Sequence, residues 1–131
     1  MSASWEAQVA LYNALIADST LMNLISSRIY DEPPTDLDYP YVVLGGMTEV
    51  AENRHNALGY SVTATFTIYT KPFGLGSYQA KNILTNMNRI LNMKSFSLTS
   101  YTMLKCYFEN AMYGREQDIR TIDVRYRILC H

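Results

Sequence analysis

The sequence predicts an α+β fold, an antiparallel sheet of about four to six strands with two main helices packed on one face. Two stretches repeat their apolar residues with a helical period, and at least three alternate with the period of a strand. Their order along the chain is helix, strands, helix, strands. We expect all of residues 1–131 to form a single domain, since domains of ~100–150 residues are the commonest.

The first helix is expected over residues 4–17, with Ser4 as its N-cap and Glu6 at the favourable end of the helix dipole. Four large apolar residues at spacings of four, three and four predict the face that packs on the core: Trp5, Val9, Tyr12 and Ile16. Asp18 and Ser19 offer a second cap, and a short helical segment should follow to Ile25.

The next stretch alternates between extended segments and turn residues. Residues 28–31 predict a brief extended segment, and residues 33–39 predict a stiff acidic loop because two prolines begin it. Residues 41–44 should be a strand that weakens or bulges at the following glycine pair. Residues 47–58 show no clear period, so they are either an exposed loop or the far end of a long hairpin.

A strand over residues 60–70 is predicted by strict alternation, with Phe66 and Ile68 on its inner face. Ser77 should cap a second long helix over residues 78–92. The apolar stripe of this helix comprises six residues: Tyr78, Ile83, Leu84, Met87, Ile90 and Leu91.

Two further strands, residues 103–112 and 119–130, should form an antiparallel hairpin around a turn at 114–118, after a possible short strand at 96–98. Alternation places Cys106 and Cys130 on the inner faces, as buried reduced thiols. The main core is expected to join the stripe of the first helix to three residues of the second and to four strand residues: Ile83, Met87, Ile90, Phe66, Ile68, Val124 and Tyr126.

The charges are unevenly distributed. Residues 1–52 hold one basic and eight acidic residues, a net charge of −7, whereas residues 53–131 hold ten basic and four acidic residues, a net charge of +6. Attraction between the two halves within one fold is the simpler explanation, and head-to-tail contact between copies in a ring is the other. The overall charge of −1 argues against broad capture of nucleic acid.

Catalytic, cofactor and metal signatures are not found in the sequence. Two cysteines and two histidines are too few and too scattered for a zinc site, and no common hydrolase, nucleotide-binding or metalloprotease motif occurs. The glycines at 74 and 76 predict a turn before a helix rather than a phosphate loop. No run of ~18 apolar residues predicts a membrane span. We therefore expect no enzyme, no cofactor and no membrane contact, and a small enzyme with a cryptic site is the least favoured class.

A nucleic-acid-binding module is the alternative from a different class. Tyrosines and the basic residues Lys105, Arg125 and Arg127 share the outer face of the predicted sheet, as in platforms for single-stranded RNA. Glu109 and Asp123 lie on the same face, however, so cross-strand ion pairs explain the pattern better.

Residues 28–46, RIYDEPPTDLDYPYVVLGG, are the most distinctive stretch. This R-I-Y-D element, proline-containing loop and aromatic-Pro-Tyr-Val-Val strand ending in glycine resemble the tail completion proteins of siphophages and prophages. The order of the remaining elements also matches that family, whose fold is similar to that of tail terminators such as the one of phage lambda.

The resemblance implies a structural function. Members of that family form a hexameric ring on the tail tube, end its elongation and join the tail to the head–tail connector (stopper) protein. The genome passes through the ring without specific binding. The implied partners are thus further copies of the chain, the tail tube protein and the connector protein. The implied location is the virion tail, assembled in the cytoplasm of the bacterial host.

A ring also requires interfaces, for which the charges supply candidates. One patch is the acidic loop: Asp31, Glu32, Asp36 and Asp38. The opposite patch is four arginines near the C-terminal hairpin: Arg115, Arg120, Arg125 and Arg127. Four charged or histidine residues of the 47–58 segment join the candidate interface: Glu49, Glu52, Arg54 and His55. We expect this segment to be mobile in the free subunit and ordered in the assembly.

Overall fold

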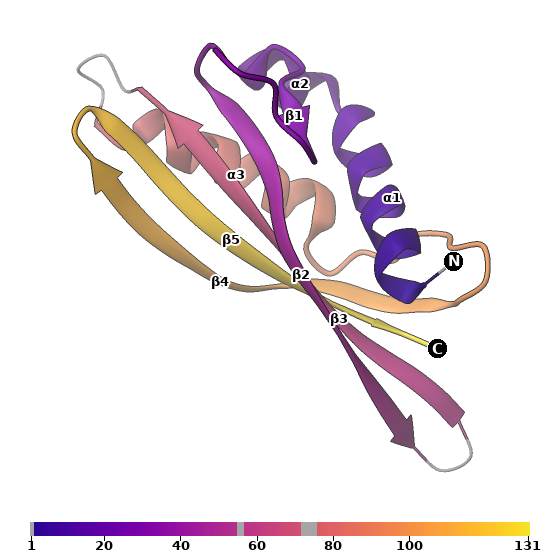
Figure 1. Ribbon diagram of the computed structural model, residues 1–131. Coiled ribbons are helices and arrows are strands. Elements are labelled where there is room, and N and C mark those ends of the chain that lie inside the picture. The colour runs from indigo at the N-terminus through magenta and orange to yellow at the C-terminus, as the bar shows by residue number, and fades with distance from the viewer. Residues whose placement is uncertain (1, 55–56, 72–75) are drawn as a thin grey trace.

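The computed structural model describes residues 2–54, 57–71 and 76–131. Within them the chain forms three helices and one five-stranded sheet (Figure 1). The helices are α1 (Ala3–Ile16), α2 (Ser19–Ile25) and α3 (Tyr78–Leu91). The strands are β1 (Ile29–Tyr30), β2 (Tyr41–Arg54), β3 (Ala57–Thr70), β4 (Met103–Glu116) and β5 (Ile119–Cys130).

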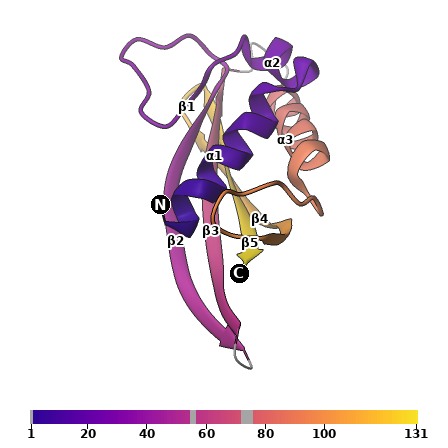
Figure 2. The same cartoon turned by 90° about the vertical axis from the view of Figure 1, so that its right-hand side faces the viewer.

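The sheet has the strand order β1-β2-β3-β5-β4, so β1 and β4 are its two edges. Every pairing is antiparallel except that of β1, which runs parallel to β2 through Ile29 and Tyr30. All three helices lie on one face of the sheet, as the side view shows (Figure 2). The α+β class predicted from the sequence is therefore confirmed.

The orientation predicted for α1 is wrong. The helix buries the face that carries small residues, including Ala3 and Ala7, together with Leu11 and Leu15. The stripe that we expected in the core is instead 37–44% exposed: Trp5, Val9, Tyr12 and Ile16. Apolar residues occur on both faces of this helix, and the alanine face allows closer approach to the underlying elements. The cap is also shifted, since Ser2 accepts the hydrogen bond from the Trp5 N–H.

Of the two interpretations of residues 47–58, the long hairpin is correct and the exposed loop is wrong. β2 continues to Arg54 and pairs with β3 from Met47 onward, after a bulge at Gly45 and Gly46. The backbone of residues 47–54 is thus held in a regular ladder, residues 55 and 56 lie outside the described residues, and the expected mobility of the free subunit stays a prediction. The hairpin projects past the end of β5 (Figure 1).

The C-terminal hairpin is longer than predicted. β4 runs to Glu116, so the turn consists of Gln117 and Asp118 rather than of the whole stretch 114–118. Gln117 has a positive φ of 54°, which the tight turn requires. The short strand expected at 96–98 is reduced to one isolated bridge, in which Ser97 pairs with Thr102.

The strand side of the predicted core is confirmed, because Phe66, Ile68, Val124 and Tyr126 are all buried. From α3, Ile83 and Met87 are buried and Ile90 is partly buried, while Tyr78 is exposed. The Tyr126 hydroxyl donates to Asn88 Oδ1 at 2.6 Å, so this buried aromatic has a polar partner on the helix.

Both cysteines are buried free thiols, as predicted. Burial raises the pKa of Cys106 to about 12 and also raises the pKa of Cys130. Because the thiolate is the reactive form, neither sulfur is suited to nucleophilic chemistry.

Candidate functional site

The acidic loop connects β1 to β2 and is anchored at its base by Arg28. The Arg28 guanidinium donates from Nε to the Pro40 carbonyl at 3.0 Å and from Nη2 to the Tyr39 carbonyl at 3.1 Å. Tyr39 lies 5.2 Å from Tyr41, which stacks on Tyr69 at 4.8 Å between ring centroids. With the base held in this way, four carboxylates are exposed to solvent: Asp31, Glu32, Asp36 and Asp38.

The four predicted arginines lie in the β4–β5 hairpin. Arg115 and Arg120 face each other across the ladder near its turn, and Arg125 lies farther along β5 and is exposed. Arg127 differs, because its guanidinium forms a salt bridge with Glu109 at 2.9 Å and donates to Ser61 Oγ at 2.6 Å. Arg127 is therefore tied within its own chain and is removed from our candidate interface.

The Arg127–Glu109 pair confirms the cross-strand ion pairing expected on the outer face. Asp123 of the same face accepts a hydrogen bond from the Thr67 hydroxyl at 2.7 Å. This neutralisation weakens the case for a nucleic-acid platform, because bound phosphate needs unpaired positive charge.

A second salt bridge joins the two oppositely charged parts of the chain. Arg89 Nη2 of α3 lies 2.8 Å from Asp18 Oδ1, the N-cap of α2. The Arg89 hydrogen bond lowers the pKa of Asp18 below its usual value. Attraction between the two halves within one fold thus accounts for this pair. Among the described residues, neither this salt bridge nor that of Arg127 joins the acidic loop to the four arginines of the β4–β5 hairpin.

The two charged patches lie at opposite sides of the sheet. The acidic loop follows β1, and three strands separate β1 from β4. The structure therefore does not bring the predicted patches together within one chain, and each remains available to another molecule.

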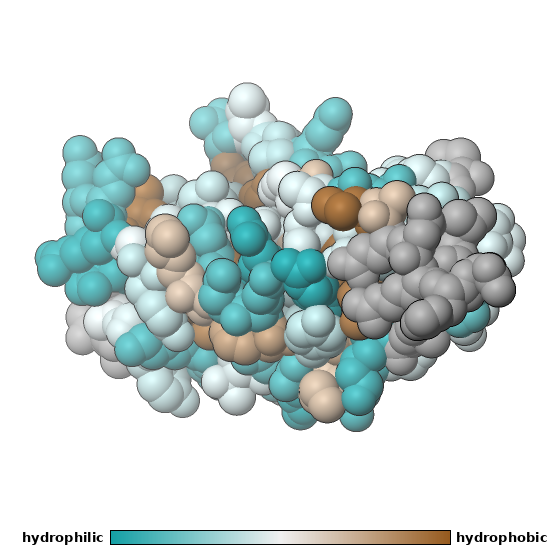
Figure 3. All heavy atoms as spheres, turned by 90° about the horizontal axis from the view of Figure 1, so that it is seen from below, coloured by the Kyte–Doolittle hydropathy of each residue, from teal (hydrophilic) through white to brown (hydrophobic). Residues whose placement is uncertain are grey.

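The candidates on the β2–β3 hairpin have different surroundings. Glu49 Oε1 accepts a hydrogen bond from the Ser4 N–H at 2.7 Å, so its carboxylate holds the start of α1. Glu52 and Arg54 lie on β2 in the projecting part of the hairpin, and His55 lies outside the described residues. Viewed from the side on which the hairpin projects, the described surface is mainly hydrophilic or neutral with scattered apolar residues (Figure 3).

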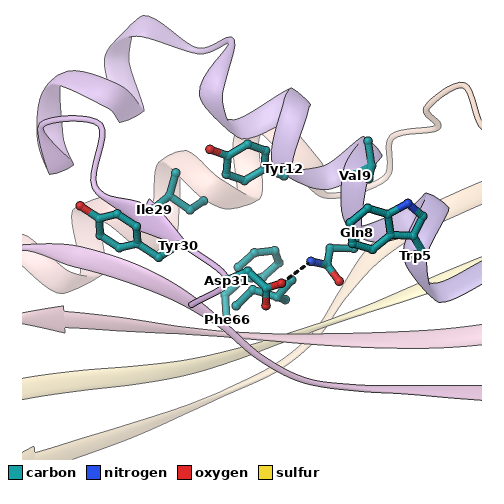
Figure 4. A pocket seen from close by; sticks show the side chains of 9 residues that line it. Trp5, Gln8, Val9, Tyr12, Ile29, Tyr30, Asp31 and Phe66 are labelled. Atoms are coloured by element: carbon teal, nitrogen blue, oxygen red, sulfur yellow. Dashed lines mark hydrogen bonds between the residues drawn. The ribbon is translucent and has the colours of Figure 1, made fainter. Parts of the chain in front are cut away.

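Sequence reasoning missed an apolar groove between α1 and β1, here called the α1–β1 groove (Figure 4). It has a volume of about 320 Å³. The α1 wall is formed by Trp5, Val9 and Tyr12, and the β1 wall by Ile29 and Tyr30. Leu44 and Phe66 also line it, and a hydrogen bond of 3.0 Å from Gln8 Nε2 to Asp31 Oδ2 crosses it. The signal in the sequence that indicates this groove is the second apolar face of α1, which our prediction places in the core.

The described residues contain no group of three or more metal-ligating side chains that could hold an ion. None of the helices within the described ranges has the length and apolarity needed to cross a membrane. Ser77 is the N-cap residue of α3, as predicted, but its side chain forms no capping hydrogen bond. Gly76 has a positive φ of 64°, consistent with the turn expected before this helix, whereas residues 72–75 lie outside the described residues.

Comparison with solved structures finds proteins of the same fold. It is similar to a chain in the virion of a native gene transfer agent (GTA) particle, with a TM-score of 0.87, 25% sequence identity and coverage of 99% of this chain and 98% of that one. The sequence then identifies the family. The model described as "Tail completion protein gp17" matches residues 9–131, and the chain belongs to that family.

The gp17 protein of bacteriophage SPP1 has the same fold, with a TM-score of 0.61, 21% identity and coverage of 95% of this chain and 89% of that one. No curated protein matches the chain. The protein is thus a structural component of the phage tail and not an enzyme. The resemblance seen in residues 28–46 is confirmed.

Proposed function

We propose that the protein forms a ring of six copies on the tail tube, ends tube elongation and joins the tail to the head–tail connector. The observation that carries this proposal is the family match over residues 9–131, supported by the similarity to a chain of the GTA virion. The ring is assembled in the bacterial cytoplasm from a phage or prophage gene and remains in the virion tail.

The charge distribution supports self-assembly. A ring requires a heterologous interface, in which one patch of each subunit contacts a different patch of its neighbour. The acidic loop follows the edge strand β1, whereas Arg115 lies on the opposite edge strand β4 and Arg120 and Arg125 lie on the neighbouring β5, so two patches of opposite charge are separated by the sheet. Two patches placed in this way can both contact a patch of opposite charge only if each contacts a different neighbouring subunit.

The ring has two further partners, the tail tube protein on one side and the connector protein on the other. The genome passes through the ring without specific binding. The overall charge of −1 agrees with this, because it gives the chain no strong electrostatic attraction for DNA.

Deletion of the gene in a strain that produces the particle tests this function. Electron micrographs should show tail tubes of uncontrolled length that are not attached to heads, and expression of the parent gene in trans should restore both length and attachment. An empty vector is the matched control. Tails of normal length joined to heads in the deletion strain would refute the function, and tails of normal length without heads would refute the role in ending elongation.

A further inference from the structure

The exposed stripe of α1 is the least expected feature of the surface. Trp5, Val9 and Tyr12 are 44%, 37% and 41% exposed, although each has a large apolar side chain. They form one wall of the α1–β1 groove, whose other wall and floor are also largely apolar (Figure 4). An apolar groove of this kind, bordered by polar residues, is typical of a protein–protein contact.

The opposite edge of the sheet carries exposed apolar groups near the end of β4. Met112 is 71% exposed and Tyr113 is 55% exposed. Tyr113 pairs with buried Ile122, which places its side chain on the helix-bearing face of the sheet. The α1–β1 groove lies on this same face, so two molecules placed edge to edge would bring Tyr113 of one towards the groove of the other.

The charges around these two features are complementary. The acidic loop begins at Asp31, which itself lines the groove, and residues 29–52 contain no lysine or arginine. Around Tyr113, by contrast, Lys81, Arg115 and Arg120 line a hollow of about 270 Å³. The Lys81 ammonium lies 5.3 Å from the centroid of the Tyr113 ring. An apolar contact flanked by opposite charges is thus available between the two edges.

We propose that the α1–β1 groove of one subunit receives Tyr113 of a second copy of the chain, while the acidic loop meets Arg115 and Arg120 of that copy. This inference rests on the ring proposed above and names its subunit interface. Because groove and tyrosine lie at opposite edges, each subunit uses its groove for one neighbour and its tyrosine for the other, which propagates the contact until the ring closes.

Cross-linking between single-cysteine variants tests this contact. Val9→Cys and Tyr113→Cys would be prepared separately, mixed and treated with a short bismaleimide. The native cysteines contribute little background because both are buried. We expect a cross-linked dimer only in the mixture, and a ladder of covalent oligomers from the double variant. Val9→Cys mixed with Val50→Cys is the matched control, since Val50 is 56% exposed on the projecting hairpin.

A second measurement compares two exposed tyrosines. Tyr113→Asp places a carboxylate at the apolar contact and should raise the concentration needed for assembly by at least about tenfold, as followed by light scattering. Tyr78→Asp, at a residue 67% exposed at the start of α3, should assemble like the parent. Equal assembly of both variants and the parent would overturn the proposed interface.

The outcomes separate the interface from the function. Rings of the parent protein without the Val9–Tyr113 cross-link would refute this interface and leave the proposed function standing. The cross-link together with normal tails in the deletion strain would support the interface and refute the function. A parent protein that stays monomeric at all concentrations, or a Val9→Cys variant that cross-links to tail tube protein instead, would refute the groove as a contact between copies.

Discussion

Glu6 shows how one residue joins distant parts of the chain. It lies on the buried face of α1, where its Oε1 accepts a hydrogen bond from the Ser100 N–H at 2.7 Å. This hydrogen bond is the main reason that the pKa of Glu6 lies below its usual value. The sequence indicated only a favourable place in the helix dipole, because a partner 94 residues away leaves no local pattern.

The first prediction concerns the pH dependence of this contact. A carboxylate whose pKa is lower in the folded than in the unfolded state stabilises the fold above the unfolded pKa, and loses this effect as the pH falls through the folded pKa. Glu6→Gln should therefore lower the melting temperature at neutral pH, and the difference from the parent should shrink in acid. Thermal melts from neutral pH to pH ~3 measure this effect. Glu116→Gln, at an exposed residue, is the control.

At the scale of elements, predictability follows the clarity of the alternation. The inner residues of β3 and β5 were identified correctly, because apolar and polar residues alternate regularly over residues 60–68 and 122–128. In α1, apolar residues occur on two faces, so the periodicity does not decide which face packs on the core. The prediction placed the face with the larger side chains in the core, and this was wrong. The small alanines pack inward because they allow the helix to lie close to its neighbours, an effect that hydrophobicity alone does not encode.

The outer half of β2 was equally hard to recognise. Its glycines and charged residues obscure the period, and its pairing with β3 supplies the backbone hydrogen bonds that define it as a strand. The bulge at Gly45 and Gly46 shifts the register between Leu44 and Met47. Sequence patterns do not report such long-range pairing, so boundaries near bulges remain the least predictable.

The second prediction uses the two glycines of this bulge. A Cβ atom at Gly45 would lie 3.3 Å from the Thr65 carbonyl oxygen, whereas one at Gly46 would meet nothing within 4 Å. Since Thr65 belongs to a strand paired on both sides, its backbone cannot move freely. Gly45→Ala should cost about 1 kcal/mol of unfolding free energy, while Gly46→Ala should be neutral or slightly stabilising.

Urea unfolding of both variants measures this difference. Equal midpoints for Gly45→Ala and Gly46→Ala would show that the bulge accommodates a side chain at either position, and the close approach to Thr65 would then carry no energetic weight.

At the scale of the whole molecule, the sequence identified which residues carry charge but not where the sheet places them. The acidic loop and Arg115 were both named from composition, yet only the strand order shows that they lie at opposite edges. Arg127 was a candidate because it lies near the C-terminal hairpin; ion pairing on its face of the sheet was expected, but the structure identifies its particular partner as Glu109. The groove was missed because α1 was misoriented: three of the four residues expected in the core, Trp5, Val9 and Tyr12, form its α1 wall instead.

The third prediction concerns assembly through these charges. The double substitution Glu32→Lys and Asp38→Lys should weaken self-assembly at low salt, because the altered loop would repel the arginines of its neighbour. Asp36 is left unchanged because its φ of 59° is poorly tolerated by lysine. Added salt should screen this repulsion, so that the difference in self-assembly between the double variant and the parent becomes smaller.

Sedimentation at two ionic strengths provides the measurement. The compensating variant Arg115→Glu and Arg120→Glu should assemble with the altered loop better than with the parent loop. Unchanged sedimentation of the loop variant at both ionic strengths would show that these charges do not belong to the interface. Circular dichroism checks that the fold of the variant is intact.

The projecting hairpin has a geometric consequence for reach. Beyond Tyr60, residues 52–54 pair with residues 57–59, and neither set pairs with β5. Two residues added to each strand would lengthen this ribbon by ~3.3 Å per residue and keep every side chain on its original face, whereas one residue would exchange the faces. The length of the hairpin can thus change in steps of two residues per strand, while the core, the helices and both edges of the sheet keep their present form.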